Sequence, residues 1–363
     1  MMEVLHIINS LEVGGAQKLL ADILPLMKCK GVNVSLLVLK SVDTPFNFQI
    51  KNSGVRIFSL DNKSYYNPLT FLKLIPFLKK FKIIHAHLFP TLYWVALARV
   101  FSASPTLFFT EHNTNNRRRN KRYLSLIERL IYSKYHKIIS ISSQTECNLK
   151  RWLGVNSLDS KFIQINNGVN LADFMRRKGN KSEIYNIPQS VRVVLMISRF
   201  TAQKDQETVI RAIQYISINN ILFAFAGSGP TIEKCKQLAH ELGVSEKIVF
   251  LGQRTDIPEL INASYIGIQS SFWEGFGLTA VEFMAGNRPI IASDVPGLKQ
   301  VVEDAGLLFP VGDEFVLAKY IIDLLSDRQY YTQVSERCLS RAEQYDIHIM
   351  VERYIEEYRK VLN

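Results

Sequence analysis

Short apolar runs alternate with amphipathic helical patterns along the whole chain. Most of the runs lack an alternation of apolar and polar residues, which is typical of parallel strands buried on both faces. The predicted strands are Val4–Ile8, Val34–Leu39, Val55–Phe58, Ile83–Ala86, Thr106–Thr110, Lys137–Ser142, Phe162–Ile165, Val191–Ile197, Ile221–Ala226, Ile248–Leu251, Ile266–Gln269 and Pro289–Ser293. Helical patterns such as Ala16–Met27, Tyr123–Tyr135 and Gln206–Ile216 lie between them. This alternation predicts doubly wound parallel sheets.

The pattern pauses once, over Asp173–Ser190, where the sequence is polar and basic. We expect the interdomain linker there. The predicted domains are residues 1–174 and 175–346, with a C-terminal helix at about 347–363 that packs back on the first domain. The fold class is therefore α/β, with two Rossmann-like domains that face each other across a cleft. Ligands of such sheets bind beyond the carboxyl ends of the strands, so we expect the site in that cleft.

Composition excludes several classes of protein. Of the 363 residues, 47% are hydrophobic and 21% are charged, which excludes a disordered or low-complexity chain. The four cysteines are far apart and form no C-x-x-C pair, so a zinc site or disulfide framework is not expected and a reducing compartment fits. The N-terminus does not resemble a signal peptide. The most apolar stretch, Leu88–Phe109, is interrupted by Pro90, Arg99 and Pro105, so we predict a buried helix and a strand there.

The net positive charge of the chain belongs to its first half. Residues 1–180 contain 26 basic and 10 acidic side chains, whereas residues 181–363 contain 18 and 23. A basic half indicates an anionic partner such as a phosphorylated ligand, a phospholipid surface or nucleic acid, unless it is only a solvated surface. No nucleic-acid-binding module or stacking platform is visible, so we expect no nucleic acid partner.

Two glycine turns follow predicted strands. Gly14 and Gly15 precede a helix, where backbone N–H groups can approach a phosphate. The turn Gly227-Ser228-Gly229-Pro230 lacks the third glycine of a dinucleotide fingerprint, which argues against a nicotinamide or flavin enzyme. A tight structural turn explains Gly14 and Gly15 equally well, and for Gly227–Pro230 a simple turn before a helix is the favoured interpretation.

Two further segments carry charge at strand ends. Arg199 and Lys204 follow Val191–Ile197 and have the spacing to clamp a diphosphate, where they would stabilise a leaving nucleoside diphosphate. Glu274 lies in a glycine-rich loop and Glu282 on the following helix. The start of that helix, near Gly277, offers free N–H groups to a phosphate. Carboxylates placed in this way can bind the hydroxyls of a sugar and a ribose.

At this point the sequence resembles the retaining glycosyltransferases of family 4, which have the GT-B fold and include bacterial enzymes of surface-polysaccharide synthesis. Glu274 and Glu282 match the E-x7-E motif of that family. Further matches in the same order are Gly14-Gly15-Ala16, His85-Ala86-His87, Asn167-Gly168-Val169-Asn170, the Arg199 and Lys204 pair, and Gly227–Pro230.

The resemblance implies roles for these residues. Arg199 and Lys204 would bind the donor diphosphate, Glu282 the ribose and Glu274 the transferred sugar. The other donor-binding candidates are Gly15, Gly227, Arg254, Gly275, Phe276, Gly277, Leu278 and Thr279. The catalytic candidates are His112, Glu274, Arg199 and Lys204, and His85 and His87 compete with His112 for its place near the donor sugar. The family retains anomeric configuration, and the leaving phosphate is generally thought to take the acceptor's proton.

Such a reaction requires neither a pair of carboxylates as acid and base nor a metal. The chain contains no D-x-D triplet, and we expect no cofactor beyond the nucleotide-sugar substrate. A UDP-sugar is favoured as donor, with GDP-mannose next. The alternatives are a non-catalytic sugar-nucleotide-binding scaffold or another GT-B enzyme such as an epimerase.

The expected acceptor half carries a basic and apolar surface. Leu69–Lys82 predicts a broken, amphipathic helix that includes Lys79 and Lys80, and basic residues follow His112 directly. The acceptor and membrane candidates are His87, Arg117, Arg118, Arg119, Lys79 and Lys80. They would hold an anionic membrane surface or a glycan or polyprenyl-diphosphate-linked acceptor. We therefore expect a cytoplasmic enzyme, peripheral on the inner face of the plasma membrane, that acts in capsule, O-antigen or exopolysaccharide synthesis.

Overall fold

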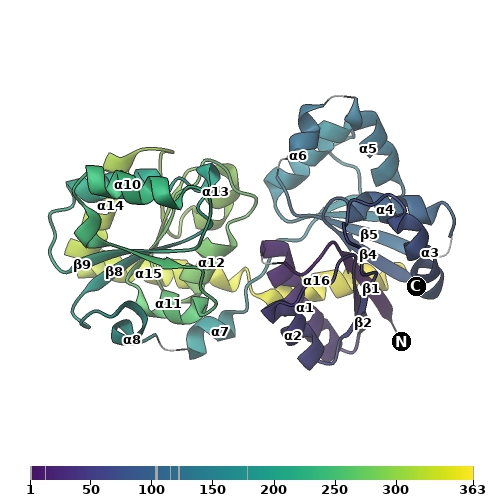
Figure 1. Cartoon of the computed structure of the whole chain (residues 1–363), viewed down its shortest axis with the longest axis horizontal. Coiled ribbons are helices and arrows are strands. Elements are labelled where there is room, and N and C mark those ends of the chain that lie inside the picture. The colour runs from purple at the N-terminus through teal and green to yellow at the C-terminus, as the bar shows by residue number, and fades with distance from the viewer. Residues whose placement is uncertain are drawn as a thin grey trace. The chain divides into compact units, whose positions relative to one another are not determined.

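The computed structural model describes residues 2–12, 14–102, 105–114, 116–121, 123–177 and 179–362, without the side chains of Arg117 and Asn120. The chain divides into two compact units (Figure 1). Unit 1 comprises Met1–Gly168 together with Ile347–Asn363, and unit 2 comprises Val169–Asp346. The described helices are not long and apolar enough for any of them to cross a bilayer.

Unit 1 is built on a seven-stranded parallel sheet in the order β3-β2-β1-β4-β5-β6-β7. Its strands are β1 (Glu3–Ile8), β2 (Asn33–Val38), β3 (Arg56–Ser59), β4 (Ile83–His87), β5 (Thr106–Glu111), β6 (Lys137–Ser140) and β7 (Phe162–Gln164). Its helices are α1 (Gly15–Cys29), α2 (Pro45–Asn52), α3 (Thr70–Lys80), α4 (Thr91–Arg99), the 3₁₀ helix η1 (Arg117–Asn120), α5 (Leu124–Ser133), α6 (Ser143–Leu153) and the C-terminal α16 (Ile347–Arg359).

Two apolar clusters cover the two faces of this sheet because successive strand residues point to opposite sides. Val4 and Ile8 belong to the cluster formed with α1 and α16, whereas Leu5 and Ile7 belong to the cluster formed with α3, α4 and α6. Figure 1 shows α16 beside α1, although the two helices are far apart in the sequence. Residues of α16 four apart, such as Tyr354 and Tyr358, are fully buried, so this helix is part of the core of unit 1.

Unit 2 contains a six-stranded parallel sheet in the order β10-β9-β8-β11-β12-β13. Its strands are β8 (Arg192–Ile197), β9 (Ile221–Ala226), β10 (Ile248–Gly252), β11 (Ile266–Gln269), β12 (Ile290–Ser293) and β13 (Leu307–Phe309). Its helices are α7 (Leu171–Arg176), α8 (Lys181–Tyr185), η2 (Ala202–Lys204), α9 (Gln206–Ala212), η3 (Ile213–Tyr215), α10 (Ile232–Glu241), η4 (Ser245–Lys247), α11 (Ile257–Ala263), α12 (Leu278–Ala285), α13 (Pro296–Val302), α14 (Glu314–Ser326) and α15 (Arg328–Glu343). Two doubly wound parallel sheets were expected, and this prediction is confirmed.

The boundary between the units differs from the expected one. It falls between Gly168 and Val169 and not after residue 174, because α7 packs on α11 and α12 of unit 2. The segment expected to be a linker is also folded: it contains α7 and α8, with Phe174 and Tyr185 buried. The Tyr185 hydroxyl donates to the Leu260 carbonyl at 2.9 Å. Two aromatic anchors therefore fasten a segment whose polar composition suggested a linker.

Three elements differ from their sequence patterns. The helix expected over Gln206–Ile216 ends as α-helix at Ala212 and continues as η3. Strand β13 was not predicted because its three residues lie between Gly306 and Pro310 and form too short a run. The helix expected to break at Pro76 runs through it, because Leu74 and Leu78 bury both halves in the core. That burial outweighs the one hydrogen bond that proline cannot donate.

Candidate functional site

Two predicted charged side chains meet in unit 2, beyond the carboxyl ends of β8 and β11. Lys204 in η2 forms an ion pair with Glu274 in the loop after β11, and these side chains are only 16% and 10% exposed. The same carboxylate oxygen, Oε1, accepts hydrogen bonds from Gln269 Nε2 at 3.1 Å and from Ser271 Oγ at 2.9 Å. Three donors therefore fix the orientation of the Glu274 carboxylate.

Backbone contacts fasten the two loops that carry this pair. The Gln203 carbonyl accepts from Phe272 N at 2.9 Å, and Gln203 Nε2 donates to the Trp273 carbonyl at 2.8 Å. Asp205, which directly follows Lys204, adopts a left-handed conformation with φ of 46°. Its carboxylate accepts a hydrogen bond from Ser270 Oγ at 3.1 Å. Burial raises the pKa of Asp205. This carboxyl group joins the start of α9 to the end of β11.

Arg199 lies in the first turn after β8, and its side chain is exposed. Gln206 Nε2 holds the backbone of this turn by donating to Ser198 Oγ and to the Arg199 carbonyl, both at 2.9 Å. Among the residues that the structure describes, no ion pair is recorded for Arg199. A fixed backbone with an exposed guanidinium group suits a side chain that binds an anion.

The Gly227–Pro230 turn supports the backbone around Arg199. Gly227 and Gly229 have φ values of 144° and 152°, which side chains rarely adopt. A Cβ atom on Gly227 would lie 1.9 Å from the Ser198 carbonyl oxygen, and one on Gly229 would lie 2.2 Å from that of Phe200. These two positions therefore require glycine, because only a residue without a Cβ atom lets this turn lie against the backbone of residues 198–200. A contact of this turn with a nucleotide stays a prediction.

The loop after Glu274 leads into α12. Gly277 caps the helix with φ of 91°, and a Cβ atom there would lie 2.5 Å from Leu298 Cδ2. Leu278 and Thr279 begin the helix, where N–H groups lack intrahelical partners and favour an anion. Glu282 lies one turn further along the same helix and is buried. The predicted donor-binding residues from 277 to 282 therefore occupy one helix start.

A residue that sequence reasoning missed sets the course of this loop. Gly297 in α13 lies directly against the backbone, since a Cβ atom there would be 2.3 Å from the Glu274 carbonyl oxygen and 3.1 Å from the Gly275 carbonyl carbon. Phe276 is buried, and its ring packs edge-on against Tyr345 at 5.4 Å between centroids. Gly275 and Phe276 thus act at least in part as structural elements of the loop.

Arg254 is engaged within its own loop after β10. Its Nε and Nη2 atoms donate to the two carboxylate oxygens of Asp256 at 2.8 and 2.5 Å. This hydrogen bonding lowers the pKa of Asp256. A role for Arg254 in binding the donor base stays a prediction.

In unit 1, two of the three competing histidines are joined by a hydrogen bond. His112 directly follows β5, and its Nε2 lies 3.1 Å from Nδ1 of His87. Burial lowers the pKa of His112 to about 4, so its imidazole is neutral at pH 7. His85 instead turns to the core, where its ring nitrogens contact the Tyr358 hydroxyl and Thr110. Of the three, His112 is the one that is partly exposed.

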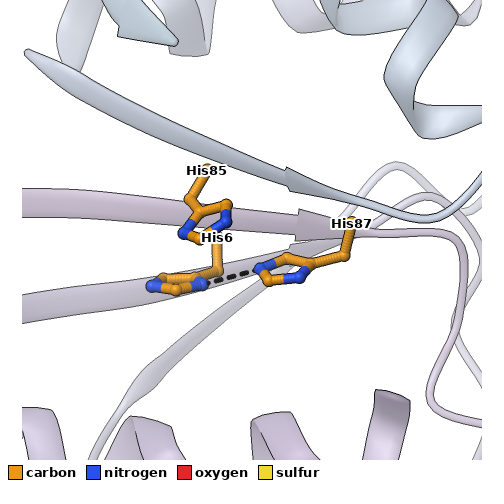
Figure 2. A group of neighbouring side chains, drawn as sticks. All are labelled: His6, His85 and His87. Atoms are coloured by element: carbon orange, nitrogen blue, oxygen red, sulfur yellow. Dashed lines mark hydrogen bonds between the residues drawn. The ribbon is translucent and has the colours of Figure 1, made fainter. Parts of the chain in front are cut away.

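The buried histidines were also considered as metal ligands. In the described part of the chain, His6, His85 and His87 have ring nitrogens within 4.8 Å of one another (Figure 2). His6 was not predicted, although its place in β1 opposite His85 in β4 follows from the strand pairing. The rings of His85 and His87 stack at 4.3 Å with an interplanar angle of 22°. A metal ion must lie in the plane of each imidazole that binds it, and stacked rings do not share such a point, so the arrangement fits hydrogen bonding better.

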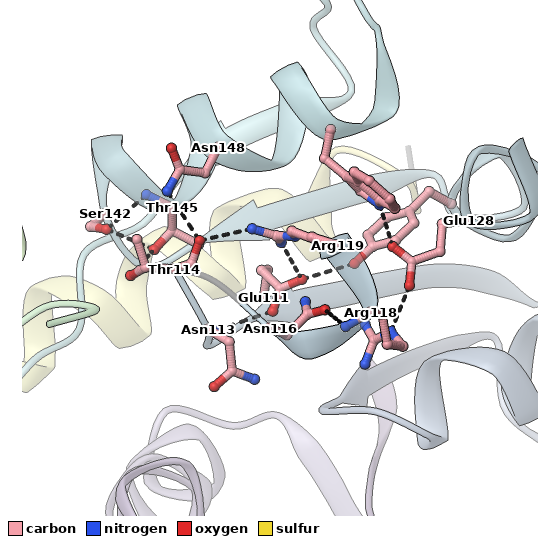
Figure 3. Close-up of polar contacts among 12 residues, drawn as sticks. Glu111, Asn113, Thr114, Asn116, Arg118, Arg119, Glu128, Ser142, Thr145 and Asn148 are labelled. Carbon is pink, nitrogen blue, oxygen red and sulfur yellow. Dashed lines mark hydrogen bonds and ion pairs between the residues drawn. The ribbon is translucent and has the colours of Figure 1, made fainter. Parts of the chain in front are cut away.

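Two of the arginines after His112 form ion pairs within unit 1, and their contact with an acceptor stays a prediction. Arg118 forms an ion pair with the fully buried Glu128 at 2.6 Å (Figure 3). Its guanidinium group lies 4.0 Å from the centroid of Phe89. Arg119 forms an ion pair with the buried Glu111 at 3.3 Å and donates to the Thr114 carbonyl at 2.8 Å. Both arginines thus neutralise buried carboxylates and anchor the segment after β5. Sequence spacing predicted cations here but gave no sign of their partners.

The other predicted residues of unit 1 lie at the surface. Gly15 begins α1, and a Cβ atom built on it meets no described atom within 4 Å. Lys79 and Lys80 are exposed in the last turn of α3. The Arg117 side chain lies outside the described residues. Contact of these residues with phosphate or membrane stays a prediction.

Further unpredicted residues of the site are Gln269, Ser271 and Asp205. The strand-end rule contains a signal for the first two, because Gln269-Ser270-Ser271 ends β11 and starts the loop of Glu274. Asp205 carried no such signal, because its contact with Ser270 joins residues far apart in the chain.

Two family descriptions match successive parts of the chain. Residues 13–173 match "Glycosyltransferase Family 4", and residues 177–341 match "Glycosyl transferases group 1". The fold and both matches together show that the chain belongs to glycosyltransferase family 4, with the GT-B fold.

Individual relatives agree with this assignment. The chain is 30% identical to the N-acetyl-alpha-D-glucosaminyl L-malate synthase of Bacillus anthracis over 52% of its own length and 51% of that protein. It is 25% identical to the UDP-Gal:alpha-D-GlcNAc-diphosphoundecaprenol alpha-1,3-galactosyltransferase of Escherichia coli over 65% of its own length and 64% of that protein. The first of these matches thus spans about half of the relative's length.

A solved structure matches over the whole chain. The crystal structure of Anabaena HepE in complex with UDP and glucose superposes with a TM-score of 0.86 at 20% identity and covers 99% of this chain and 100% of that one. At this identity the likeness concerns the fold.

Proposed function

We propose that the protein transfers a sugar from a nucleotide-sugar donor to a glycan acceptor, with retention of anomeric configuration and without a metal. The observation that carries this proposal is the Lys204–Glu274 pair beside Arg199 at the strand ends of unit 2. The two cations would stabilise the negative charge that develops on the leaving diphosphate. The Glu274 carboxylate, held by Gln269 and Ser271, would accept hydrogen bonds from hydroxyls of the transferred sugar.

The favoured donor is a UDP-sugar, with GDP-mannose next. The UDP-sugar is supported by the HepE structures, one of which contains UDP-glucose, and by the Escherichia coli relative, whose name gives UDP-Gal as donor. A lipopolysaccharide core mannosyltransferase of Rhizobium meliloti, 28% identical over 33% of this chain, supports the second choice. Glu282 and the start of α12 would hold the ribose and the diphosphate.

Binding and turnover can be tested together. Thermal shifts with UDP, GDP and ADP, with and without EDTA, should identify one diphosphate that stabilises the protein irrespective of EDTA. A ligand at about 100 times its Kd adds roughly 2.7 kcal/mol of stability. Arg199→Ala should lose this shift, whereas Arg328→Ala, an exposed arginine at the start of α15, should keep it. Binding without transfer to any glycan acceptor would favour a sugar-nucleotide-binding scaffold, and epimerised product would favour an epimerase.

The acceptor proposed is a lipid-linked glycan at the inner face of the plasma membrane, in the synthesis of capsule, O-antigen or exopolysaccharide. Support comes from the basic first half of the chain and from exposed apolar side chains of α5, where Leu126 and Leu130 are 70% and 68% exposed. A basic surface with exposed leucines suits an anionic membrane.

Flotation with vesicles tests the membrane contact. Vesicles that contain anionic lipid should retain the protein at low salt, and neutral vesicles should not. The double variant Leu126→Gln with Leu130→Gln should reduce retention, while Phe315→Gln on α14 of unit 2, also exposed, should not. Absence of wild-type retention at low salt would contradict the membrane part of the proposal and leave the transferase part standing.

A further inference from the structure

Four histidines of unit 1 lie on one face of its sheet. His6 is paired with His85 in register, and His87 lies two residues after His85 on β4. Thr110 on β5 has the same orientation, and His112 follows two residues later. Because side chains two apart point to the same side of a strand, all of them face the cluster that contains α16. Figure 2 shows His6, His85 and His87 gathered there, with His87 nearest the strand ends.

Hydrogen bonds connect these side chains into one continuous series, from His112 to Tyr354, which we call the histidine relay. From His112, Nε2 contacts His87 Nδ1 at 3.1 Å, and His87 Nε2 contacts His6 Nδ1 at 3.0 Å. His6 Nε2 lies 3.4 Å from the Tyr358 hydroxyl of α16, which contacts His85 Nδ1 at 2.5 Å.

The histidine relay ends at a second tyrosine of α16. His85 Nε2 contacts Thr110 Oγ1 at 2.7 Å, and Thr110 contacts the Tyr354 hydroxyl at 3.2 Å. Except for His112, every member is fully or almost fully buried. The histidine relay therefore runs from the core of unit 1 to the partly exposed ring of His112.

The tautomers of the four histidines in the relay depend on one another because all four imidazoles are neutral. Burial lowers the pKa of His6 to about 3 and that of His112 to about 4, and it holds those of His85 and His87 well below their usual range. All four imidazoles are therefore neutral at pH 7. A neutral imidazole has one donor nitrogen and one acceptor nitrogen, so each ring that donates on one side must accept on the other. One choice of direction consequently fixes the tautomer of every ring.

The contact distances at Tyr358 select the direction. A hydroxyl donor makes shorter hydrogen bonds than a ring N–H donor. The 2.5 Å contact thus assigns the Tyr358 O–H as donor to His85 Nδ1, and the 3.4 Å contact assigns His6 Nε2–H as donor to the Tyr358 oxygen. It follows that His87 donates from Nε2 to His6, and His112 donates from Nε2 to His87.

We propose that Tyr358 is a positioning residue that holds His112 in its Nε2–H tautomer through His6 and His87. The other ring nitrogen of His112, Nδ1, is then an unprotonated acceptor suited to a hydroxyl group of a sugar. This catalytic consequence rests on the proposed transferase function, whereas the tautomer itself does not. The C-terminal helix thereby acts on His112, after the end of β5, through two intervening imidazoles.

The test uses two matched variants of one helix. Tyr358→Phe removes the hydroxyl in the middle of the chain, and Tyr354→Phe removes the hydroxyl at its end. Without the Tyr358 oxygen, an Nε2–H of His6 would be buried without a partner, which is costlier than a buried acceptor. We therefore expect the bonds from His6 to His112 to reverse in Tyr358→Phe, so that His112 carries its proton on Nδ1.

Long-range ¹H–¹⁵N spectra of the full chain with ¹⁵N-labelled histidine report these tautomers directly, and His112→Gln assigns the signal. The expected result is an Nε2–H His112 in the wild type and in Tyr354→Phe, with Nδ1 moving to the position of a protonated nitrogen in Tyr358→Phe. An unchanged His112 signal in a folded Tyr358→Phe variant would overturn the proposal. Stoichiometric binding of Zn²⁺ that shifts the His6, His85 and His87 signals together would overturn it as well.

Kinetics separate this proposal from the proposed function. With a transferase assay, Tyr358→Phe should lower kcat while the affinity for the nucleoside diphosphate stays unchanged, and Tyr354→Phe should resemble the wild type. If no transfer is found in any form of the protein, the proposed function fails, and the spectra still decide on the relay. If transfer is found and kcat is equal in both variants, the influence of Tyr358 on the reaction is refuted.

Discussion

Lys204 and Glu274 are assigned opposite tasks by the family resemblance, yet they form one ion pair in unit 2. The cation would bind a diphosphate, and the carboxylate would bind sugar hydroxyls. Because the carboxylate is also fixed by Gln269 and Ser271, the more mobile partner is the lysine side chain. Removing the carboxylate should therefore free a cation for phosphate while it removes an acceptor for the sugar.

Glu274→Gln is predicted to separate binding from transfer. The variant should bind the nucleoside diphosphate as well as the wild type or better, since Lys204 loses its counter-ion. Transfer should fall by about 100-fold, in the range measured for the loss of one preorganised electrostatic contact. Calorimetric titration and initial rates check the two parts, with Glu303→Gln on the exposed end of α13 as control. A parallel loss of diphosphate affinity would contradict these roles.

Among the elements, the connection from β5 to α5 shows how buried charge places a loop. Glu128 is fully buried on α5 and accepts from Arg118 Nε, the Tyr93 hydroxyl and Trp152 Nε1. Glu111 at the end of β5 accepts from Arg119 and from the Tyr132 hydroxyl. These two carboxylates hold the residues that follow His112, so the loop after β5 is tied to the core of unit 1 (Figure 3).

Glu128→Gln should destabilise unit 1. The amide offers one acceptor, and its NH₂ group would face the N–H donors of Arg118 or Trp152. Breaking one partner of a buried ion pair costs about 3–5 kcal/mol. Denaturant unfolding checks this value, and Glu12→Gln, whose partner Lys40 lies 3.8 Å away in an exposed pair, should cost less than about 1 kcal/mol. Equal stabilities of the two variants would show that Glu128 does not anchor the loop.

Two glycine turns should respond in opposite ways to alanine. Gly229→Ala places a Cβ atom 2.2 Å from the Phe200 carbonyl oxygen at a φ of 152°, so it should destabilise unit 2 and displace Arg199. Gly15→Ala meets no described atom and should unfold like the wild type. Its affinity for the donor then reports whether phosphate approaches Gly15 closely. A stable Gly15→Ala variant with unchanged donor affinity would remove Gly15 from the donor site.

At the scale of the whole molecule, the two units carry different kinds of buried polar group. Both contain buried ion pairs, of which Lys204–Glu274 carries the candidate donor site of unit 2, but unit 1 also contains the hydrogen-bonded histidines. The helix α16 completes unit 1, so the core that surrounds His6 and His85 requires residues far along the chain from both histidines. The stability of unit 1 should therefore depend on pH through these imidazoles.

Unit 1 should lose stability as the pH falls below about 6.5. In the unfolded chain the histidines bind protons near that pH, but burial lowers the pKa of His112 to about 4 and that of His6 to about 3, so the folded state resists protonation. Each of these two histidines should lower the free energy of unfolding of unit 1 by about 2 kcal/mol at pH 5. In the variant Trp273→Phe, the remaining Trp94 and Trp152 report on unit 1 alone, and their thermal transition should shift downward between pH 7.5 and 5. A transition independent of pH would contradict the lowered pKa values.

The sequence by itself determined the features that depend on neighbours in the chain. Short apolar runs indicated the strands of both sheets except β13, and motifs at or after strand ends indicated Arg199, Lys204, Glu274 and Glu282. Only the tertiary structure decided which of these side chains are engaged and by which partner. Tyr358 meets His85 across 273 residues, and Arg118 meets a glutamate that no local pattern connects with it. The reason is physical: periodicity reports which face a side chain occupies, whereas a buried charge or imidazole takes its partner from whichever element packs against that face.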